Sequence, residues 1–155
     1  MVKRVIIAIL YAFTGHASFA ADAACYDLKV RAVAISQIPS IYPRSDDPNV
    51  IVMSWPWFLD LKVNRVIEGE TSAGVIEALA VMHVKYVRKN LTWFLRKNAA
   101  GTYNVIRSDE PEKLIRCGAD LLPARPPITP APGQSYGDLR KEGETGYRGL
   151  GGNPE

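Results

Sequence analysis

The sequence of 155 residues predicts a mostly β protein. Apolar and polar side chains alternate in residues 28–34 and again in residues 59–63, and this two-residue period is typical of half-buried strands. Three further apolar segments cover residues 75–86, 91–95 and 102–106. Polar turns separate the five segments, which is the spacing of a small all-β domain.

The segment from residue 50 to residue 67 contains one break in its alternation. Val66 and Ile67 are adjacent apolar residues, so the alternation changes phase after Val63. One extra residue in a strand produces such a change. We therefore predict a β-bulge near Asn64 and Arg65.

Loops and turns complete the expected fold. Three prolines predict a loop over residues 36–49, and residues 98–101 predict a hairpin loop with Gly101 at a positive φ. Residues 112–116 fit either a short closing helix or another pairing segment. A helix over residues 73–86 is the rival to a strand there, but the Val and Ile content favours the strand.

These elements predict a small five-stranded, OB-like Greek-key barrel with one short helix and a disordered C-terminal tail. A β-sandwich is the alternative. We expect the barrel domain to cover residues 21–121. Residues 122–155 are rich in proline, glycine and charge, with few bulky aliphatic residues, and such a segment does not bury enough apolar surface to become ordered.

Residues 1–20 have the pattern of a cleavable signal peptide. Lys3 and Arg4 precede an apolar run of nine residues, 5–13, and Ser18 and Ala20 fit a cleavage site after Ala20. A membrane-spanning helix needs about 20 apolar residues. We therefore expect a periplasmic or secreted protein with no membrane span in the mature chain; an uncleaved anchor, cleavage after residue 24 and a lipidated Cys25 are the alternatives.

The mature chain is close to neutral. Without Lys3 and Arg4, 17 of the 19 basic side chains remain against 16 acidic ones, so the net charge falls from +3 to +1. This balance does not indicate binding to a polyanion. We expect no nucleic-acid partner.

The two cysteines, Cys25 and Cys117, both lie in the mature chain. An even number of cysteines in an exported protein favours a disulfide bond, with two buried thiols as the alternative. A bridge over so long a segment stabilises the fold by roughly 4–5 kcal/mol in the chain-entropy model.

No catalytic set, metal site or cofactor motif is evident in the sequence. The only histidine after the leader is His83, whereas a zinc site needs three or four ligands. Nucleophile-elbow and phosphate-loop motifs are both lacking. The acidic pairs at 46–47 and 109–110 lie in predicted loops, where carboxylates are usually solvated.

Two segments carry candidate binding residues. Residues 55–58 read Trp-Pro-Trp-Phe, which fits either a corner of the core or an exposed aromatic patch. A basic stretch with interleaved aromatic residues follows residue 84, and it fits either a ligand-binding face or a charged strand edge. The candidate residues are Trp55, Trp57, Phe58, Lys85, Tyr86, Arg88 and Lys89.

The chain resembles the netrin-like module, whose best-known members are the tissue inhibitors of metalloproteinases. The resemblance rests on a cysteine that opens the first strand, a strand that runs into Glu68-Gly69, an apolar strand, the 93–103 hairpin and a closing cysteine. It implies an OB-type barrel that binds another protein. The inhibitors chelate the protease zinc through an N-terminal cysteine in a Cys-x-Cys start, whereas this chain reads Cys25-Tyr26-Asp27.

We therefore expect an exported, non-catalytic binding module that engages another exported or envelope protein. Inhibition of an exported peptidase is one form that this role takes in the family that the chain resembles. The alternative is an envelope hydrolase or a metal-dependent enzyme with an unrecognised site.

Overall fold

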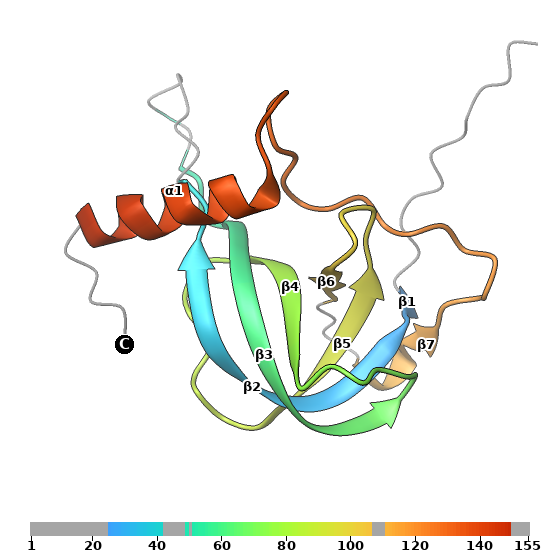
Figure 1. Cartoon of the computed structure of the whole chain (residues 1–155). Helices are drawn as coiled ribbons and strands as arrows, with labels where there is room; N and C mark the ends of the chain where they lie inside the picture. Colours follow the sequence, from blue (N-terminus) through green and yellow to red (C-terminus); the bar gives the residue numbers. More distant parts are fainter. Residues whose placement is uncertain (1–24, 42–48, 50, 107–110, 150–155) are drawn as a thin grey trace, which may run out of the picture.

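A computed structural model describes residues 25–41, 49, 51–106 and 111–149 (Figure 1). Five strands close into a barrel in the order β2-β3-β4-β6-β5. β4 pairs with β6 in parallel, and the other neighbours are antiparallel. The strands are β2 (Leu28–Pro39), β3 (Trp55–Glu68), β4 (Val75–Met82), β5 (Leu91–Lys97) and β6 (Tyr103–Val105).

This architecture confirms the predicted mostly β, five-stranded OB-like barrel. Residues 75–82 form a strand, so the rival helix over residues 73–86 and the β-sandwich are both wrong. The predicted signal peptide, residues 1–20, lies outside the described residues.

The predicted bulge is present in β3. Arg65 pairs with Arg31 and Val63 pairs with Ala32, so Asn64 has no partner in the ladder with β2. An unpaired residue bends its strand and increases the local twist. The bulge therefore helps the long strand β3 to curve around the barrel.

Alternate residues of the strands point into the barrel and form its core. Two core indoles satisfy their N–H groups on backbone carbonyls: Trp57 Nε1 donates to Met82 O at 3.1 Å, and Trp93 Nε1 donates to Ala32 O at 3.0 Å. A buried indole needs such a partner. The core consists of Leu28, Val30, Ala32, Ala34, Trp57, Leu59, Leu61, Ile76, Ala78, Ala80, Met82, Trp93 and Leu95.

The hairpin loop between β5 and β6 forms where the sequence predicts it. Gly101 has φ of 78°, a left-handed conformation that favours glycine. The buried Asn98 side chain accepts hydrogen bonds from the N–H groups of Ala100 and Thr102 at 3.0 and 3.1 Å. These contacts hold the loop in one conformation.

Residues 111–116 combine both expectations for this segment. A 3₁₀ turn covers Pro111–Lys113, and β7 (Ile115–Arg116) pairs in parallel with β1 (Cys25–Tyr26). The disulfide between Cys25 and Cys117 closes this small sheet over a sequence separation of 92, with an S–S distance of 2.07 Å. The predicted disulfide is therefore confirmed.

The predicted loop over residues 36–49 begins later than expected. β2 continues through Pro39, because Ile38 pairs with Phe58 and Pro39 pairs with Trp57. Proline is tolerated there because it ends the strand. Residues 42–48 lie outside the described residues.

The tail, residues 122–155, differs most from the expectation of disorder. Helix α1 covers Tyr136–Gly149, and Ala124 is buried, with backbone hydrogen bonds to Lys97 and Ala99. Ser135 Oγ accepts from the N–H of Asp138 at 3.1 Å, and the Asp138 carboxylate accepts from Ser135 N and Oγ. These bonds lower the pKa of Asp138 and form a capping box that starts the helix.

Helix α1 lies across the end of β2 (Figure 1) and is bonded to β3 through Arg140. Arg140 donates to both carboxylate oxygens of Asp60, at 2.9 and 2.5 Å, and to Ser36 Oγ at 3.3 Å. Gly143 lies so close to the Pro39 carbonyl that a Cβ atom there would collide with it. Long-range contacts therefore order a segment whose own composition is unfavourable for a helix.

In the described part of the chain, no helix is long and apolar enough to cross a membrane.

Candidate functional site

The barrel presents two ends with different chemistry. Pro39 pairs with Trp57, and Trp55 pairs with Met82, so the end of β2, the start of β3 and the end of β4 meet at one end. We call this the Trp55 end. The start of β2, the end of β3 and the end of β5 meet at the opposite end, beside the Cys25–Cys117 bond. We call this the disulfide end.

Two of the candidate aromatic residues pack inside the protein. Trp57 is 4% exposed and belongs to the barrel core. Phe58 is 6% exposed and lines a small gap of about 90 Å³ with Tyr136 and Gly137 of α1. Their positions favour the core-corner interpretation for these two residues.

Trp55 lies at the rim of the barrel and is half-buried. Its ring centroid is 5.9 Å from that of Trp57 and 6.4 Å from that of His83, which meets it edge-on. His83 Nδ1 lies 2.6 Å from Met53 O, and because a carbonyl only accepts, Nδ1 carries the proton. These contacts tie the segment before β3 to the segment after β4.

Exposed aliphatic side chains lie on the segments next to Trp55. They lie on the segments that enter and leave the barrel at this end, and Ile51 and Val84 are 77% and 65% exposed. Single exposed apolar residues are common, but a group at one end of a domain is typical of a contact surface. The group consists of Ile41, Ile51, Met53, Val81, Val84 and Val87.

The basic candidate residues lie in the loop that leaves the Trp55 end after β4 and reaches the start of β5, where Asn90 contacts Asn64 and Leu91 pairs with Ala32. Tyr86 anchors this loop: its ring is 4.7 Å from that of Trp93, its N–H donates to Gln37 Oε1 at 2.6 Å, and its carbonyl accepts from Gln37 Nε2 at 2.9 Å. Arg88 and Lys89 are exposed, and Lys85 is half-buried. Residues 83–90 contain no acid, so the loop adds positive charge beside the aliphatic group.

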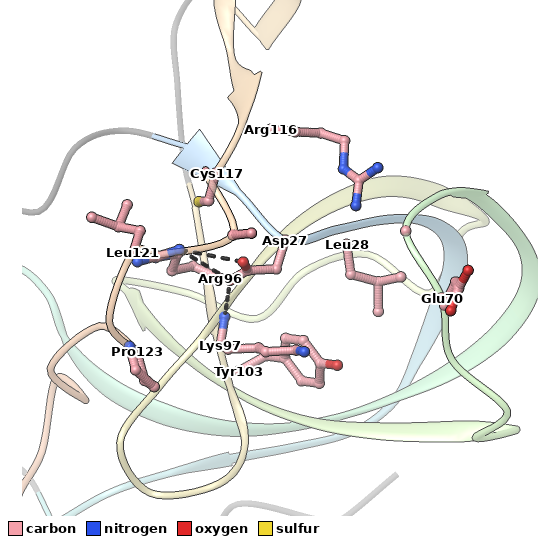
Figure 2. A pocket seen from close by; sticks show the side chains of 13 residues that line it. Asp27, Leu28, Glu70, Arg96, Lys97, Tyr103, Arg116, Cys117, Leu121 and Pro123 are labelled. Carbon is pink, nitrogen blue, oxygen red and sulfur yellow. Dashed lines mark hydrogen bonds and ion pairs between the residues drawn. The ribbon is translucent and has the colours of Figure 1, made fainter.

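A pocket of about 550 Å³ opens at the disulfide end (Figure 2). Its lining joins the start of β2, the end of β5, the start of β6 and the chain that follows β7. This volume is within the range of small-ligand sites. The lining side chains that carry charge are Asp27, Glu70, Arg96, Lys97 and Arg116.

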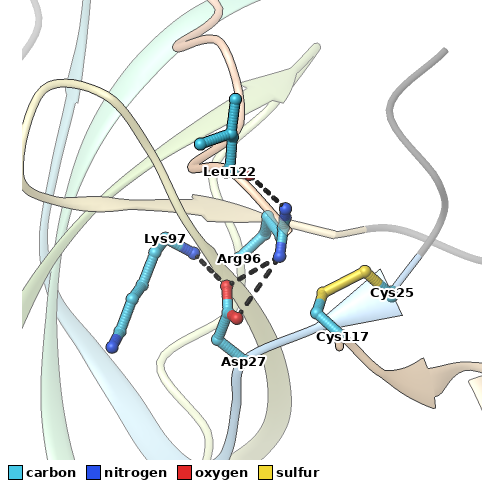
Figure 3. The surroundings of a disulfide bond; sticks show 6 residues. All are labelled: Cys25, Asp27, Arg96, Lys97, Cys117 and Leu122. Atoms are coloured by element: carbon cyan, nitrogen blue, oxygen red, sulfur yellow. Dashed lines mark hydrogen bonds and ion pairs between the residues drawn. A yellow bond between two sulfur atoms is a disulfide. The ribbon is translucent and has the colours of Figure 1, made fainter. Parts of the chain in front are cut away.

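The ion pair between Arg96 and Asp27 forms one wall of this pocket, and both side chains have further hydrogen-bond partners (Figures 2 and 3). Arg96 is 3% exposed, and its Nη1 lies 3.3 Å from each carboxylate oxygen of Asp27, while its Nη2 donates to Leu122 O at 2.5 Å. The N–H of Lys97 donates to Asp27 Oδ2 at 2.7 Å. A buried charge requires partners of this kind.

Tyrosine hydroxyls at this end are held in their protonated form. Burial, with the nearby charge of Asp27, raises the pKa of Tyr103. Burial also raises the pKa of Tyr26, whose hydroxyl donates to Glu68 at 2.6 Å. That hydrogen bond, together with one from Lys29 at 3.1 Å, lowers the pKa of Glu68.

The sequence did not reveal the pocket at the disulfide end. Asp27 lies two residues after Cys25, and Arg116 lies one residue before Cys117. Each cysteine has a charged residue within two positions in the chain. An expected bridge between the cysteines therefore predicts that Asp27 and Arg116 lie close together.

The described residues contain no group of three or more His, Cys, Asp or Glu side chains that is arranged to hold a metal ion. Both cysteines are used in the disulfide. The acidic pairs at 46–47 and 109–110 lie outside the described residues.

Comparisons with known proteins found nothing similar to this chain: protein-family models, curated proteins and solved structures each gave no match.

Proposed function

We propose that this protein is an exported, non-catalytic binding module and that its Trp55 end engages another protein. The observation that carries the proposal is the group of exposed aliphatic side chains on the segments next to Trp55, which the exposed Arg88 and Lys89 follow in the chain. Protein interfaces commonly combine an apolar centre with a charged rim, and aromatic residues, Met and Arg are enriched in them. The positive rim favours a partner with acidic side chains at its contact edge.

Export is part of the same proposal. The Cys25–Cys117 disulfide is compatible with an oxidising compartment outside the cytoplasm. Residues 1–20 have the pattern of a signal peptide, and their removal would leave Ala21 as the first residue. N-terminal sequencing and intact mass of the exported protein check this: we expect a chain that begins at Ala21 and carries one disulfide.

The netrin-like resemblance remains a prediction and is consistent with a protein partner. Zinc chelation in the inhibitor family uses the free amine of a first cysteine, and a chain that begins at Ala21 has the Cys25 amine in a peptide bond. Cys25 is also 3% exposed. We therefore place the proposed contact at the Trp55 end and not at Cys25.

Paired substitutions test the proposed surface. Val84→Asp and Val87→Asp place a charge on exposed sites of the Trp55 end, and Val75→Asp places the same charge at the start of β4, where the side chain is 47% exposed. The tagged parent protein first captures its partner from an envelope or culture-medium extract, and the variants are then compared with that purified partner.

We expect at least tenfold weaker binding for Val84→Asp and Val87→Asp, because a charge in an apolar contact is desolvated without a partner. Val75→Asp should bind like the parent. Thermal unfolding of all three variants controls for folding, and it should change little because the three sites are exposed. Equal binding by all variants, or failure of the parent to capture a specific partner, would contradict the proposal.

A further inference from the structure

The pocket at the disulfide end has the features of a small-anion site. Its volume of about 550 Å³ is within the range of sites that hold a small organic ligand. It lies at the opposite end of the barrel from the surface proposed for protein binding. Its occupant is therefore a separate question from the identity of the protein partner.

Two basic side chains that line the pocket form no ion pair with the described residues. Asp27 already accepts two contacts from Arg96 Nη1 and one from the Lys97 N–H. Within the described part of the chain, the Lys97 amine and the Arg116 guanidinium have no hydrogen bond or ion pair. Two cations in one concave site, unpaired in the protein, favour an anionic ligand.

The remaining acid of the lining does not cancel these cations. Glu70 forms no ion pair with the described residues, and Figure 2 shows its carboxylate apart from the Arg116 guanidinium. Glu68 lies near Arg116, but its two oxygens accept hydrogen bonds from Tyr26 and Lys29. Three basic and two acidic residues line the pocket, Asp27, Glu70, Arg96, Lys97 and Arg116, so the lining has a net charge of +1.

A neutral donor completes the set. Tyr103 pairs with Lys97 across β5 and β6, so the hydroxyl and the amine approach the pocket from neighbouring strands (Figure 2). The hydroxyl is available as a donor because it remains protonated. A carboxylate accepts from an ammonium and a hydroxyl together, and the Arg116 guanidinium faces the same pocket from the other side of Leu28 (Figure 2).

The disulfide holds the Arg116 side of the pocket against the barrel. Arg116 and the residues from Cys117 to Leu121 are joined to the barrel end by the Cys25–Cys117 bond, by the two-residue pairing of β1 with β7, and by the hydrogen bond from Cys117 N to Tyr26 O at 2.9 Å. From these contacts we propose that the pocket binds a small ligand through a carboxylate group, held by Arg116, Lys97 and Tyr103.

Three probes identify the source of the carboxylate: succinate, tri-alanine with a free C-terminus, and tri-alanine amide. Each is titrated into the oxidised, full-length protein while amide chemical shifts are followed by NMR. We expect saturable shifts at Lys97, Tyr103 and Ala119 with succinate or with free tri-alanine, and none with the amide. Binding of succinate alone indicates a free small acid, and binding of free tri-alanine alone indicates a chain terminus.

Charge variants make the test specific. Arg116→Gln should weaken binding about tenfold, as expected for loss of one charge-assisted hydrogen bond. Glu70→Gln removes a repelling charge and should strengthen it. Lys62→Gln, at an exposed site on β3, is the matched control and should have no effect. Absence of saturable shifts at 20 mM probe, equal binding of the amide, or equal weakening by Lys62→Gln and Arg116→Gln would overturn the proposal.

Discussion

The Trp55 end and the disulfide end of this barrel are stabilised in different ways and expose different chemistry. The Trp55 end is joined by ring packing and by side-chain hydrogen bonds to the backbone, such as those of Gln37 with Tyr86, and its aliphatic side chains face solvent. The disulfide end is joined by a covalent bond and a buried ion pair, and it encloses a polar pocket.

This difference has a physical origin. β7 contributes two residues and no buried side chain, so packing alone does not attach it to the barrel. The Cys25–Cys117 bond compensates for that weakness. At the other end, β2, β3 and β4 form long ladders that position the rim without a covalent bond, and apolar side chains next to this rim are exposed to solvent.

The largest effect should follow from removal of the disulfide. Replacing Cys25 and Cys117 together with serine should lower the free energy of unfolding by roughly 4–5 kcal/mol, because the bridge restricts a very long segment of the unfolded chain. Urea denaturation measures the change. The carboxylate site should be lost as well, because its Arg116 wall is no longer fixed. An unchanged urea midpoint would show that the disulfide end is stable without its bond.

The two tryptophans at the Trp55 end should behave differently. Trp57→Ala should cost about 3–5 kcal/mol, since it leaves a core cavity and removes the donor to Met82 O. Trp55→Ala should cost less because this ring is half-buried, yet it should weaken partner binding more than its effect on stability explains. Urea denaturation and partner titration of both variants separate the roles. Equal costs in stability would contradict the assignment of Trp55 to the rim.

A third substitution pair tests the contact between α1 and the end of β2. Gly143→Ala should detach the helix, because the new Cβ atom collides with the Pro39 carbonyl. Gly146→Ala is the control: its Cβ meets no atom within 4 Å, and alanine should stabilise the helix by up to about 1 kcal/mol. Amide hydrogen exchange across residues 139–145 reports the outcome. Similar protection in both variants would show that the contact does not hold α1.

The smallest effect should be a pH dependence of the disulfide end that comes from Glu68. The pKa of Glu68 is lowered by its hydrogen bonds with Tyr26 and Lys29. A lowered pKa stabilises the fold above the unfolded value, near 4.3, and this contribution is lost as the pH falls through the folded value. NMR titration of the Tyr26 and Lys29 amides should show a transition below that value. Glu68→Gln should abolish it; a transition that persists in this variant would assign it to another group.

Much of the barrel follows from local sequence patterns. The alternation in residues 28–34 and 59–63 predicts the strands, the phase change before Val66 predicts the bulge, and Gly101 predicts the hairpin loop. Each of these features depends on residues that are near one another in the chain. Local patterns therefore carry enough information to place them.

The tail and the pocket depend on contacts that no local pattern contains. Helix α1 has four glycines in 14 residues, and Arg140 is ordered by Asp60 and Ser36, which lie 80 and 104 residues away in the chain. The pocket likewise combines Asp27, Lys97 and Arg116 only after the barrel has closed. Composition predicts a disordered tail, whereas long-range ion pairing and capping stabilise the helix.

Site-specific photo-crosslinking tests the central claim most directly. A benzoylphenylalanine at position 84 lies at the Trp55 end, whereas one at position 75 lies at the start of β4, opposite Lys62 in the middle of β3 and beside α1; Val84 is 65% exposed and Val75 is 47% exposed. The account predicts one discrete crosslinked adduct with the partner from position 84 and none from position 75. Adducts of equal yield from both positions, or an adduct from position 75 alone, would contradict it.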